Sequence, residues 1–426
     1  MSEEPRTSSP GPTPSGGPFR ALRSRPYRLF FCGQVLSVIG TWTQATAVAW
    51  ILVRETGDGK ALGLVIALQF FPLLLLGAWS GALADRLDRR HLLLGANIAA
   101  GLVALATAVA VASGHTSVST LATASLLLGL TSAIETPARQ SFVSQLVTPV
   151  DLQSALGLNG AIMTGSRLLG SALAGLLIAT LGAETCLYVN AASFLAAIAA
   201  LALLGRENLR ASPRLARAKG QVRAGLRYAW RNVELRLPLL SMAVVGTLAF
   251  NAQVTTPLLA RITFRAGPAL FAAFSAAGGF GALLGSIRAA SRRKAEAHHI
   301  AVTALGFGAM TLAIAAAPRV ELGLVAMAVA SFFGSQFIQA CSARVQTVTA
   351  SEFRGRVTAL YSILFLGSTP IGSLIMSALI DATNPRFAYV LAGTTTVLCG
   401  VAVHLRSRPA VPFISEGGPL PRHSLN

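Results

Sequence analysis

Twelve stretches of the chain are rich in apolar residues, and short polar segments separate them. The predicted spans are 27–53, 62–84, 91–113, 117–138, 154–180, 184–205, 238–260, 268–289, 298–317, 321–343, 356–380 and 386–405. A helix needs roughly 20 mostly apolar residues to cross the hydrocarbon core of a bilayer, and each stretch has about that length. The pattern therefore predicts an all-α polytopic membrane protein with about twelve transmembrane helices.

The composition agrees with a surface that lipid rather than water solvates. Hydrophobic residues make up 53% of the 426 residues and charged residues only 12%, whereas soluble domains carry about 25% charged residues. The net charge of +19 is typical of nucleic-acid-binding proteins, but the Lys and Arg residues form short clusters between apolar stretches and no single basic face. We therefore expect the lipid bilayer, and no nucleic acid, as a partner.

The positions of the basic residues predict the orientation in the membrane. Of the 35 Lys and Arg residues, 28 lie at the termini and in the even-numbered loops, and six lie in the other loops. Loops with an excess of Lys and Arg stay on the cytoplasmic side. We expect a multi-pass protein of the cell (inner) membrane with both termini in the cytoplasm.

The longest polar segment divides the chain into two six-helix halves. We expect a disordered tail at 1–18, a first half at 19–205, a basic cytoplasmic linker at 206–237, a second half at 238–408 and a disordered tail at 409–426. The second part of the linker has apolar residues at helical spacing and arginines on another side. This pattern predicts an amphipathic helix along the cytoplasmic membrane surface, or alternatively a solvated linker helix.

The two halves resemble each other in sequence. GAWSGALADRLDRR begins at Gly77, and GALLGSIRAASRRK begins at Gly281. Gly81 then matches Gly285, and Arg89 matches a second arginine at the same offset. Parallel repeats are typical of duplicated transporter halves, which bind their substrate between the halves near the membrane midplane.

Four motifs resemble those of a known transporter family. The segment GALADRLDRR at 81–90 resembles the signature loop of the major facilitator superfamily. PARQSF at 137–142, RLLGSALAG at 167–175 and FRGRV at 353–357 with GSTPIG at 367–372 resemble the branch that contains the enterobactin exporter and related efflux proteins. The resemblance covers residues 20–408.

The resemblance implies a function. A member of this branch is expected to be a secondary active transporter of the major facilitator fold, with two pseudo-symmetric halves and alternating access. It would export small hydrophobic or amphiphilic molecules, such as a drug, secondary metabolite or siderophore, in exchange for protons. The alternatives are an importer of the same fold and a membrane receptor or enzyme without a transport cycle.

The signature loop is expected to act as a conformational gate. Asp85 would favour the positive N-terminal end of span eleven, near Arg356, and the arginines could pair with Glu135 or Asp151. The alternative is that the arginines only fix the topology. The predicted gate residues are Gly81, Asp85, Arg86, Arg89 and Arg90.

Arg167 lies near the middle of an apolar span. A charge at that depth is costly unless it faces protein or water, which indicates a functional site. An anionic substrate group or a carboxylate within the membrane could pair with it. A structural ion pair, or a side chain that reaches to the surface, is the alternative.

Glu135 and Arg139 are four residues apart, so they share a helix face near the cytoplasmic end of span four. Glu135 is the main candidate for an acid that takes up and releases a proton, and Asp381 at the external end of span eleven is a second candidate. The alternative for Glu135 is an ion pair with the signature loop.

Other polar and aromatic side chains in the spans could line a mostly apolar cavity for amphiphilic substrates, or form hydrogen bonds between helices. This set consists of Gln34, Trp42, Gln44, Gln69, Phe70, Asn251, Gln253, Gln336 and Gln339.

Neither an enzyme nor a metal site is indicated. The four cysteines lie in apolar stretches without a CxxC pair, and the six histidines lack ligand spacing. Nucleophile–base and nucleotide-binding motifs are also missing from the sequence. We expect no enzyme activity and no cofactor, a small-molecule substrate and protons as partners, and a monomer.

Overall fold

The computed structural model describes residues 19–148, 150–205, 221–265, 267–290 and 296–407. The predicted tails and the first part of the linker lie outside the described residues. Within them, twelve helices or helix groups are long and apolar enough to cross a membrane, and the predicted fold class is confirmed.

The first half begins with a short 3-10 helix, η1 (Arg20–Arg23), and continues with six long helices. These are α1 (Arg25–Thr56), α2 (Gly59–Arg86), α3 (Arg89–Ala112), α4 (Val118–Leu146), α5 (Leu152–Thr180) and α6 (Ala183–Leu203).

The linker contains α7 (Gln221–Arg231), and the second half follows it. Span seven consists of α8 (Val233–Ala249), α9 (Ala252–Leu258) and the π-helical turn η3 (Leu259–Thr263). Spans eight to ten are α10 (Pro268–Ala290), α11 (Ala297–Ala316) and α12 (Val320–Val348). Span eleven consists of α13 (Ser351–Leu366) and α14 (Ser368–Ala382), and α15 (Pro385–Ser407) is the last span.

The helix ends follow from local chemistry. Asp88 accepts the backbone N–H groups of Arg90 and His91 as the N-cap of α3, and Ser117 accepts the N–H of Thr120 at the start of α4. Gly57 ends α1 in the left-handed region at φ 64°, which glycine adopts without steric cost. These capping residues fix where the helices begin and end, and therefore where the short loops between the spans lie.

The second half repeats the packing of the first. In the first half α1 packs on α5 and α6, α2 packs on α4, and α3 packs on α4 and α6. In the second half α8 packs on α13, α14 and α15, α10 packs on α12, and α11 packs on α12 and α15. The same neighbours therefore recur at equivalent positions of the two halves.

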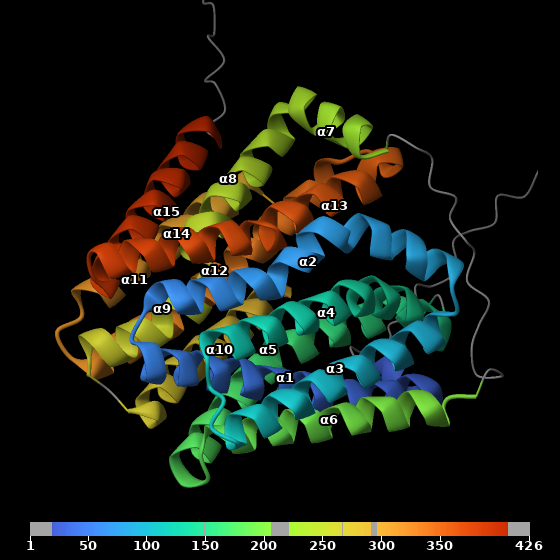
Figure 1. The fold of residues 1–426 in the computed structure, drawn as a ribbon. Helices are drawn as coiled ribbons and strands as arrows, with labels where there is room; N and C mark the ends of the chain where they lie inside the picture. Colours follow the sequence, from blue (N-terminus) through green and yellow to red (C-terminus); the bar gives the residue numbers. More distant parts are fainter. Residues whose placement is uncertain (1–18, 149, 206–220, 266, 291–295, 408–426) are drawn as a thin grey trace, which may run out of the picture.

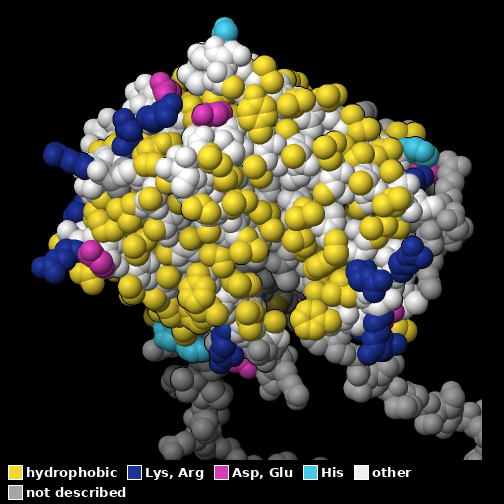
Figure 2. Space-filling view, turned by 90° about the horizontal axis from the view of Figure 1, so that it is seen from below, with side chains coloured by type: hydrophobic (Ala, Val, Ile, Leu, Met, Phe, Trp, Pro, Cys, Tyr) yellow, Lys and Arg dark blue, Asp and Glu magenta, His cyan; other side chains and the backbone are white. Residues whose placement is uncertain are grey.

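The outer surface is predominantly apolar. Large side chains such as Leu102, Leu195 and Leu398 are more than 60% exposed, although they lie in the middle of long helices. Figure 2 shows a surface covered by hydrophobic side chains, with Lys and Arg gathered toward its edges. Such a surface suits lipid contact.

Spans seven and eleven differ from the prediction. Span seven starts at Val233 rather than 238 and is interrupted at Phe250 and Asn251; span eleven starts at Ser351 rather than 356 and is interrupted at Gly367. The first break has a local cause, because the Asn251 side chain donates a hydrogen bond to the Thr247 carbonyl at 2.6 Å and competes with the backbone ladder.

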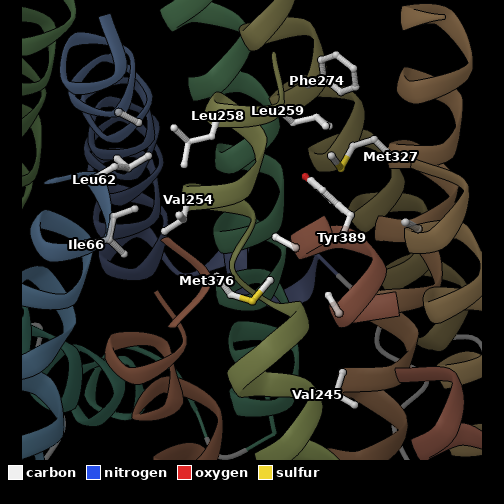
Figure 3. Close-up of a cluster of buried hydrophobic side chains, with 14 of the residues drawn as sticks. Leu62, Ile66, Val245, Val254, Leu258, Leu259, Phe274, Met327, Met376 and Tyr389 are labelled. Carbon is white, nitrogen blue, oxygen red and sulfur yellow. The ribbon is translucent and has the colours of Figure 1, made fainter. Parts of the chain in front are cut away.

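The two halves meet through α2 on α14 and through α5 on α10. In Figure 1 they converge on the left, near α9, and diverge toward the ends of α6 and α15. We name the end that carries Arg20 and Ser407 the terminal face, and the end that carries Gly57 and Thr383 the opposite face. Toward the opposite face, Leu62 and Ile66 of α2 lie against Val254 and Leu258 of α9 (Figure 3).

The linker helix is attached to the second half. The Tyr228 ring of α7 stacks on Phe353 of α13 with centroids 4.3 Å apart and planes at 3°. The Tyr228 hydroxyl also accepts the N–H of Ala350 at 3.2 Å. Leu226 and Trp230 are exposed on this helix. An amphipathic helix is thus present at the predicted place, anchored on one side to α13.

Candidate functional site: a central cavity between the halves

A cavity of about 270 Å³ lies between the two halves at mid-depth. Ligand pockets commonly measure about 300–1,000 Å³, so the space suits a small molecule. One wall is a stripe on α1 formed by Gln34, Ser37, Thr41 and Gln44, whose spacing of three and four residues places them on one helix face. The predicted residues Trp42, Gln69, Phe70 and Gln253 also line the cavity.

Glu135 and Arg139 form the acidic and basic part of the wall. Arg139 Nε lies 3.5 Å from Glu135 Oε1, and Gln34 Nε2 donates to the same oxygen at 3.3 Å. Arg139 Nε is buried and makes no hydrogen bond, so the contact with Glu135 is one of charge. The predicted shared helix face is confirmed. Both residues lie within α4 and line the cavity, not the cytoplasmic end of the span.

Arg167 also lines the cavity, from the middle of α5. Its guanidinium carbon lies 5.3 Å from the centroid of the Trp42 ring, which is a cation–π contact. A close approach of α1 and α5 fixes this arrangement, because a Cβ at Gly170 would come within 2.7 Å of Trp42 Cβ. Among the described residues, no ion pair with a carboxylate involves Arg167.

Two functional candidates were missed in the sequence. Asn190 of α6 lines the cavity and donates to Gln44 Oε1 at 2.7 Å, and Ser171 of α5 bonds to Thr46 at 3.3 Å. Asn190 is an isolated amide side chain in an apolar span, as Gln44 is. The criterion that identified Gln44 therefore also predicts Asn190 as a cavity residue.

Three predicted cavity residues lie elsewhere. Asn251 and Gln336 are buried and do not line the cavity, and Gln339 is exposed. The cavity face of α12 carries Met327 and Ser331. At about 100° per residue, Gln339 lies about 120° around the helix from Met327, so its prediction as a cavity residue is wrong.

The second half contributes a wall of different chemistry. Its lining residues are Ala252, Gln253, Thr256, Phe271, Phe274, Ser275, Gly278, Met327 and Ser331. All charged lining residues, namely Glu135, Arg139 and Arg167, come from the first half. The cavity is therefore largely apolar, with its charge on one side.

The signature loop is only partly described. The backbone of Gly81, Asp85 and Arg86 belongs to α2, and their side chains lie outside the described part of the structure. Arg89 starts α3. Arg90 donates to the carbonyl oxygens of Leu201 and Ala202 at 2.8 and 2.9 Å.

The pairing expected for Arg90 is therefore wrong. It caps the C-terminal end of α6, where unsatisfied carbonyls carry partial negative charge. The two acids proposed as its partners have others: Glu135 lies against Arg139, and Asp151 pairs with Arg20 Nε at 2.8 Å.

Asp381 forms a contact between the halves at the opposite face. Its two carboxylate oxygens accept the N–H groups of Gly59 and Lys60, each at 2.8 Å. We call this contact the clasp. The hydrogen bond with Asp381 has the largest effect on the neighbouring Asp58 and lowers the pKa of its carboxyl, whereas burial opposes this shift.

Further contacts hold the halves together next to the clasp. Ser373 Oγ donates to the Gly63 carbonyl at 3.2 Å, and Arg261 donates to the Arg54 carbonyl at 3.3 Å. A side chain at Gly63 would overlap Ser377 of α14. The opposite face is therefore closed in this structure.

In the described part of the chain, no group of three or more His, Cys, Asp or Glu side chains could hold a metal ion. The four cysteines are free, and Cys186 and Cys341 are buried.

Comparisons with known proteins identify relatives. Residues 16–416 match the protein family described as transmembrane secretion effector. The chain is 25% identical over 393 residues to the multidrug efflux pump Tap of Mycobacterium tuberculosis, a match that covers 89% of this chain and 93% of that protein. It is 27% identical over 173 residues to the staphyloferrin A transporter of Staphylococcus aureus, covering 40% of this chain and 43% of that protein.

Solved structures show a similar fold at low sequence identity. The nucleoside transporter NupG superposes with a TM-score of 0.68 at 12% identity, over 89% of this chain and 98% of that chain. A bacterial homologue of the human lysosomal transporter Spinster, in an inward-facing and unoccupied conformation, superposes with a TM-score of 0.66 at 16% identity, over 90% of this chain and 95% of that chain.

Proposed function

Because the chain belongs to the transmembrane secretion effector family of major facilitator transporters, we propose that it exports small hydrophobic or amphiphilic molecules by alternating access, in exchange for protons. The chain is a multi-pass membrane transporter of this superfamily. Export, the proton as coupling ion and the substrate class are the parts that we propose.

The central cavity carries the proposal. It lies between two packed halves that repeat each other, and its opposite-face side is closed by the clasp and by the contacts of α2 with α14. A cavity of apolar residues with a few hydrogen-bonding groups suits amphiphilic molecules. One relative is named as a multidrug efflux pump, which favours export, and the other is named as a transporter of staphyloferrin A, which favours a small-molecule cargo.

We assign the terminal face to the cytoplasm. The excess of Lys and Arg at the termini and in the loops of this face supports the assignment. With this orientation the structure is closed toward the outside, and cargo would enter the cavity from the cytoplasm. An importer of the same fold would release its cargo from this state, and the efflux pump among the relatives favours export instead.

Glu135 is the proposed proton-exchanging acid. It is the only acidic residue among the described side chains that line the cavity, and it contacts both Arg139 and Gln34. Protonation would remove its charge and weaken the contact with Arg139. A cycle of exchange requires that proton and cargo bind the two conformations with different affinity.

The signature loop stays a predicted gate at the terminal face. Gly81, Asp85, Arg86 and Arg89 keep this role in the proposal, whereas Arg90 has the capping contact described above. The monomeric state also stays a prediction.

Export is tested by dye accumulation in cells. Cells with and without the protein are loaded with a panel of fluorescent amphiphiles, with and without a protonophore. We expect several-fold lower accumulation of at least one dye in cells with the protein, and loss of the difference on addition of the protonophore. Equal accumulation of every dye under all conditions would contradict export of this class.

Two matched variants locate the coupling acid. Glu135→Gln should abolish the protonophore-sensitive difference. Glu55→Gln removes an acid that is exposed at the opposite face and should behave as wild type. If both variants reduced the protonophore-sensitive difference equally, Glu135 would not be the proton-exchanging acid.

A further inference from the structure

The two cavity arginines have different surroundings. Arg139 lies against Glu135, four residues earlier on the same helix. Arg167 lies over the Trp42 ring, and no described carboxylate pairs with it. Because the described lining contains one acid and two arginines, its formal charge is +1.

The contact with Trp42 leaves the hydrogen-bonding capacity of Arg167 available. The cation–π contact uses the positive charge of the guanidinium, and the Trp42 ring is not a conventional hydrogen-bond acceptor. The five N–H donors of the planar guanidinium point outward within its plane, where they match a carboxylate or phosphate with two parallel hydrogen bonds. An oxyanion would therefore bind to the N–H groups at the edge of the Arg167 guanidinium.

The close approach of two helices brings Trp42 and Arg167 together. Trp42 and Arg167 belong to α1 and α5 of the same half, and these helices approach closely at Gly170. The Thr43 hydroxyl also donates to the Gly170 carbonyl at 3.1 Å. The pair does not hold the halves together, so its charge is free to serve a ligand.

We propose that Arg167 binds an acidic group of the cargo, so that the transported molecule is an amphiphile with a carboxylate or a phosphate-like oxyanion. The apolar part of the molecule then lies against the second-half wall of Phe271, Phe274 and Met327. This inference rests on the proposed use of the central cavity and deepens it. A partly buried cation that no described carboxylate neutralises gains from a ligand that brings the opposite charge.

The experiment compares probes that differ in charge alone. Purified full-length protein in an uncharged maltoside detergent is titrated with 1-naphthaleneacetate and with its neutral isostere 1-naphthaleneacetamide, and heat is measured. Wild-type protein should bind the carboxylate about tenfold more tightly than the amide, the ratio that a difference of about 1.4 kcal/mol produces. 1-Naphthylmethylamine, a cation, should bind most weakly.

Three variants identify the residue. Arg167→Gln should reduce the preference for the carboxylate to within about twofold and leave the affinity for the amide unchanged. Arg167→Lys should retain part of the preference, because it keeps the charge and loses the planar fork. Arg288→Gln, at an exposed position in the last turn of α10, should keep the wild-type preference.

Several outcomes would overturn the inference. These are a wild-type preference for the amide or the amine, a preference that survives in Arg167→Gln, and no saturable binding of the carboxylate up to about 10 mM. Phosphatidylglycerol added to the micelles is a fourth probe. Competition by this lipid well below the concentration of the carboxylate would assign the anion to a lipid headgroup and refute the cargo assignment.

Binding in detergent is independent of transport. If cells show no export but Arg167 governs the preference for anions, the proposed function fails and the binding site stands. If cells export dyes but Arg167→Gln leaves the preference unchanged, the proposed function stands and this inference fails.

Discussion

Removal of the clasp should shift the protein toward a state that is open at the opposite face. Asp381 of the second half caps the N-terminus of α2 in the first half through two hydrogen bonds of 2.8 Å. Separation of the halves at this face must break both bonds. Asp381→Ala removes the two acceptors and the negative charge, so it should destabilise the closed state alone.

The size of the shift follows from the chemistry of helix caps. Loss of an N-cap acceptor costs about 0.5–2 kcal/mol, and a charge near a helix N-terminus contributes about 0.3–1 kcal/mol. These two contributions overlap, and Asp381 is exposed, so we expect about 1 kcal/mol in total. A change of that size alters the ratio of closed to open molecules about fivefold. Asp381→Asn keeps one acceptor and should give a smaller shift.

Pulsed electron–electron resonance measures this ratio. Spin labels at Ser113, directly after α3, and at Glu321 on α12 report the separation of the halves, since both residues are exposed at the opposite face. The four native cysteines are replaced first. The ratio of long to short distances should rise about fivefold in Asp381→Ala compared with the parent.

The matched control is Glu55→Gln. This acid lies at the same face and pairs with Arg54 of its own helix at 2.6 Å, so its loss breaks no contact between the halves. Its distance distribution should equal that of the parent. An unchanged distribution in Asp381→Ala, or an equal shift in Glu55→Gln, would refute the clasp as a determinant of the equilibrium.

Two further predictions concern stability. Gly281→Val should destabilise the folded protein by about 1–3 kcal/mol or more in thermal unfolding, because a side chain there would overlap the Ala328 carbonyl, whereas Gly95→Val, with open space around it, should have a much smaller effect. Asp88→Ala should cost about 0.5–2 kcal/mol in denaturant unfolding at pH 7. Burial alone would raise the pKa of Asp88, but the backbone N–H groups of His91 and Arg90 and the charge of His91 together lower it from its usual 3.8. The stabilisation is therefore complete above about pH 4 and is lost as the pH falls through the lowered pKa. An equal cost at pH 3 and pH 7 would contradict this prediction.

Span positions could be predicted because the length of an apolar stretch is a property of the sequence alone. The breaks in spans seven and eleven could not, since they depend on contacts that form only on folding. Phe250 has helix-compatible chemistry, but its ring packs between Phe307 and Phe365 with centroid distances of 5.0 and 5.9 Å. Asn251 then forms its own bond to the backbone at the break.

The cavity wall on the first half could be predicted because charged and amide side chains are rare in membrane spans. Glu135 and Arg167 were identified on this ground, and the structure places both at the cavity. The same criterion failed for Gln339, because sequence alone does not give the rotation of α12 about its axis. The hydrogen-bond partner of Arg90 could not be predicted either, because it is a backbone carbonyl of α6 and every residue has such a group.

The uneven division of the cavity wall has a consequence for variation among related transporters. Substitutions of lining residues on α10 and α12 would reshape an uncharged wall of the cavity and leave its charged residues intact. Substitutions of Glu135 and Arg139 on α4, or of Arg167 on α5, would change the charge of the cavity. Mutations in the second half can therefore change the shape of the cavity separately from mutations in the first half that change its charge.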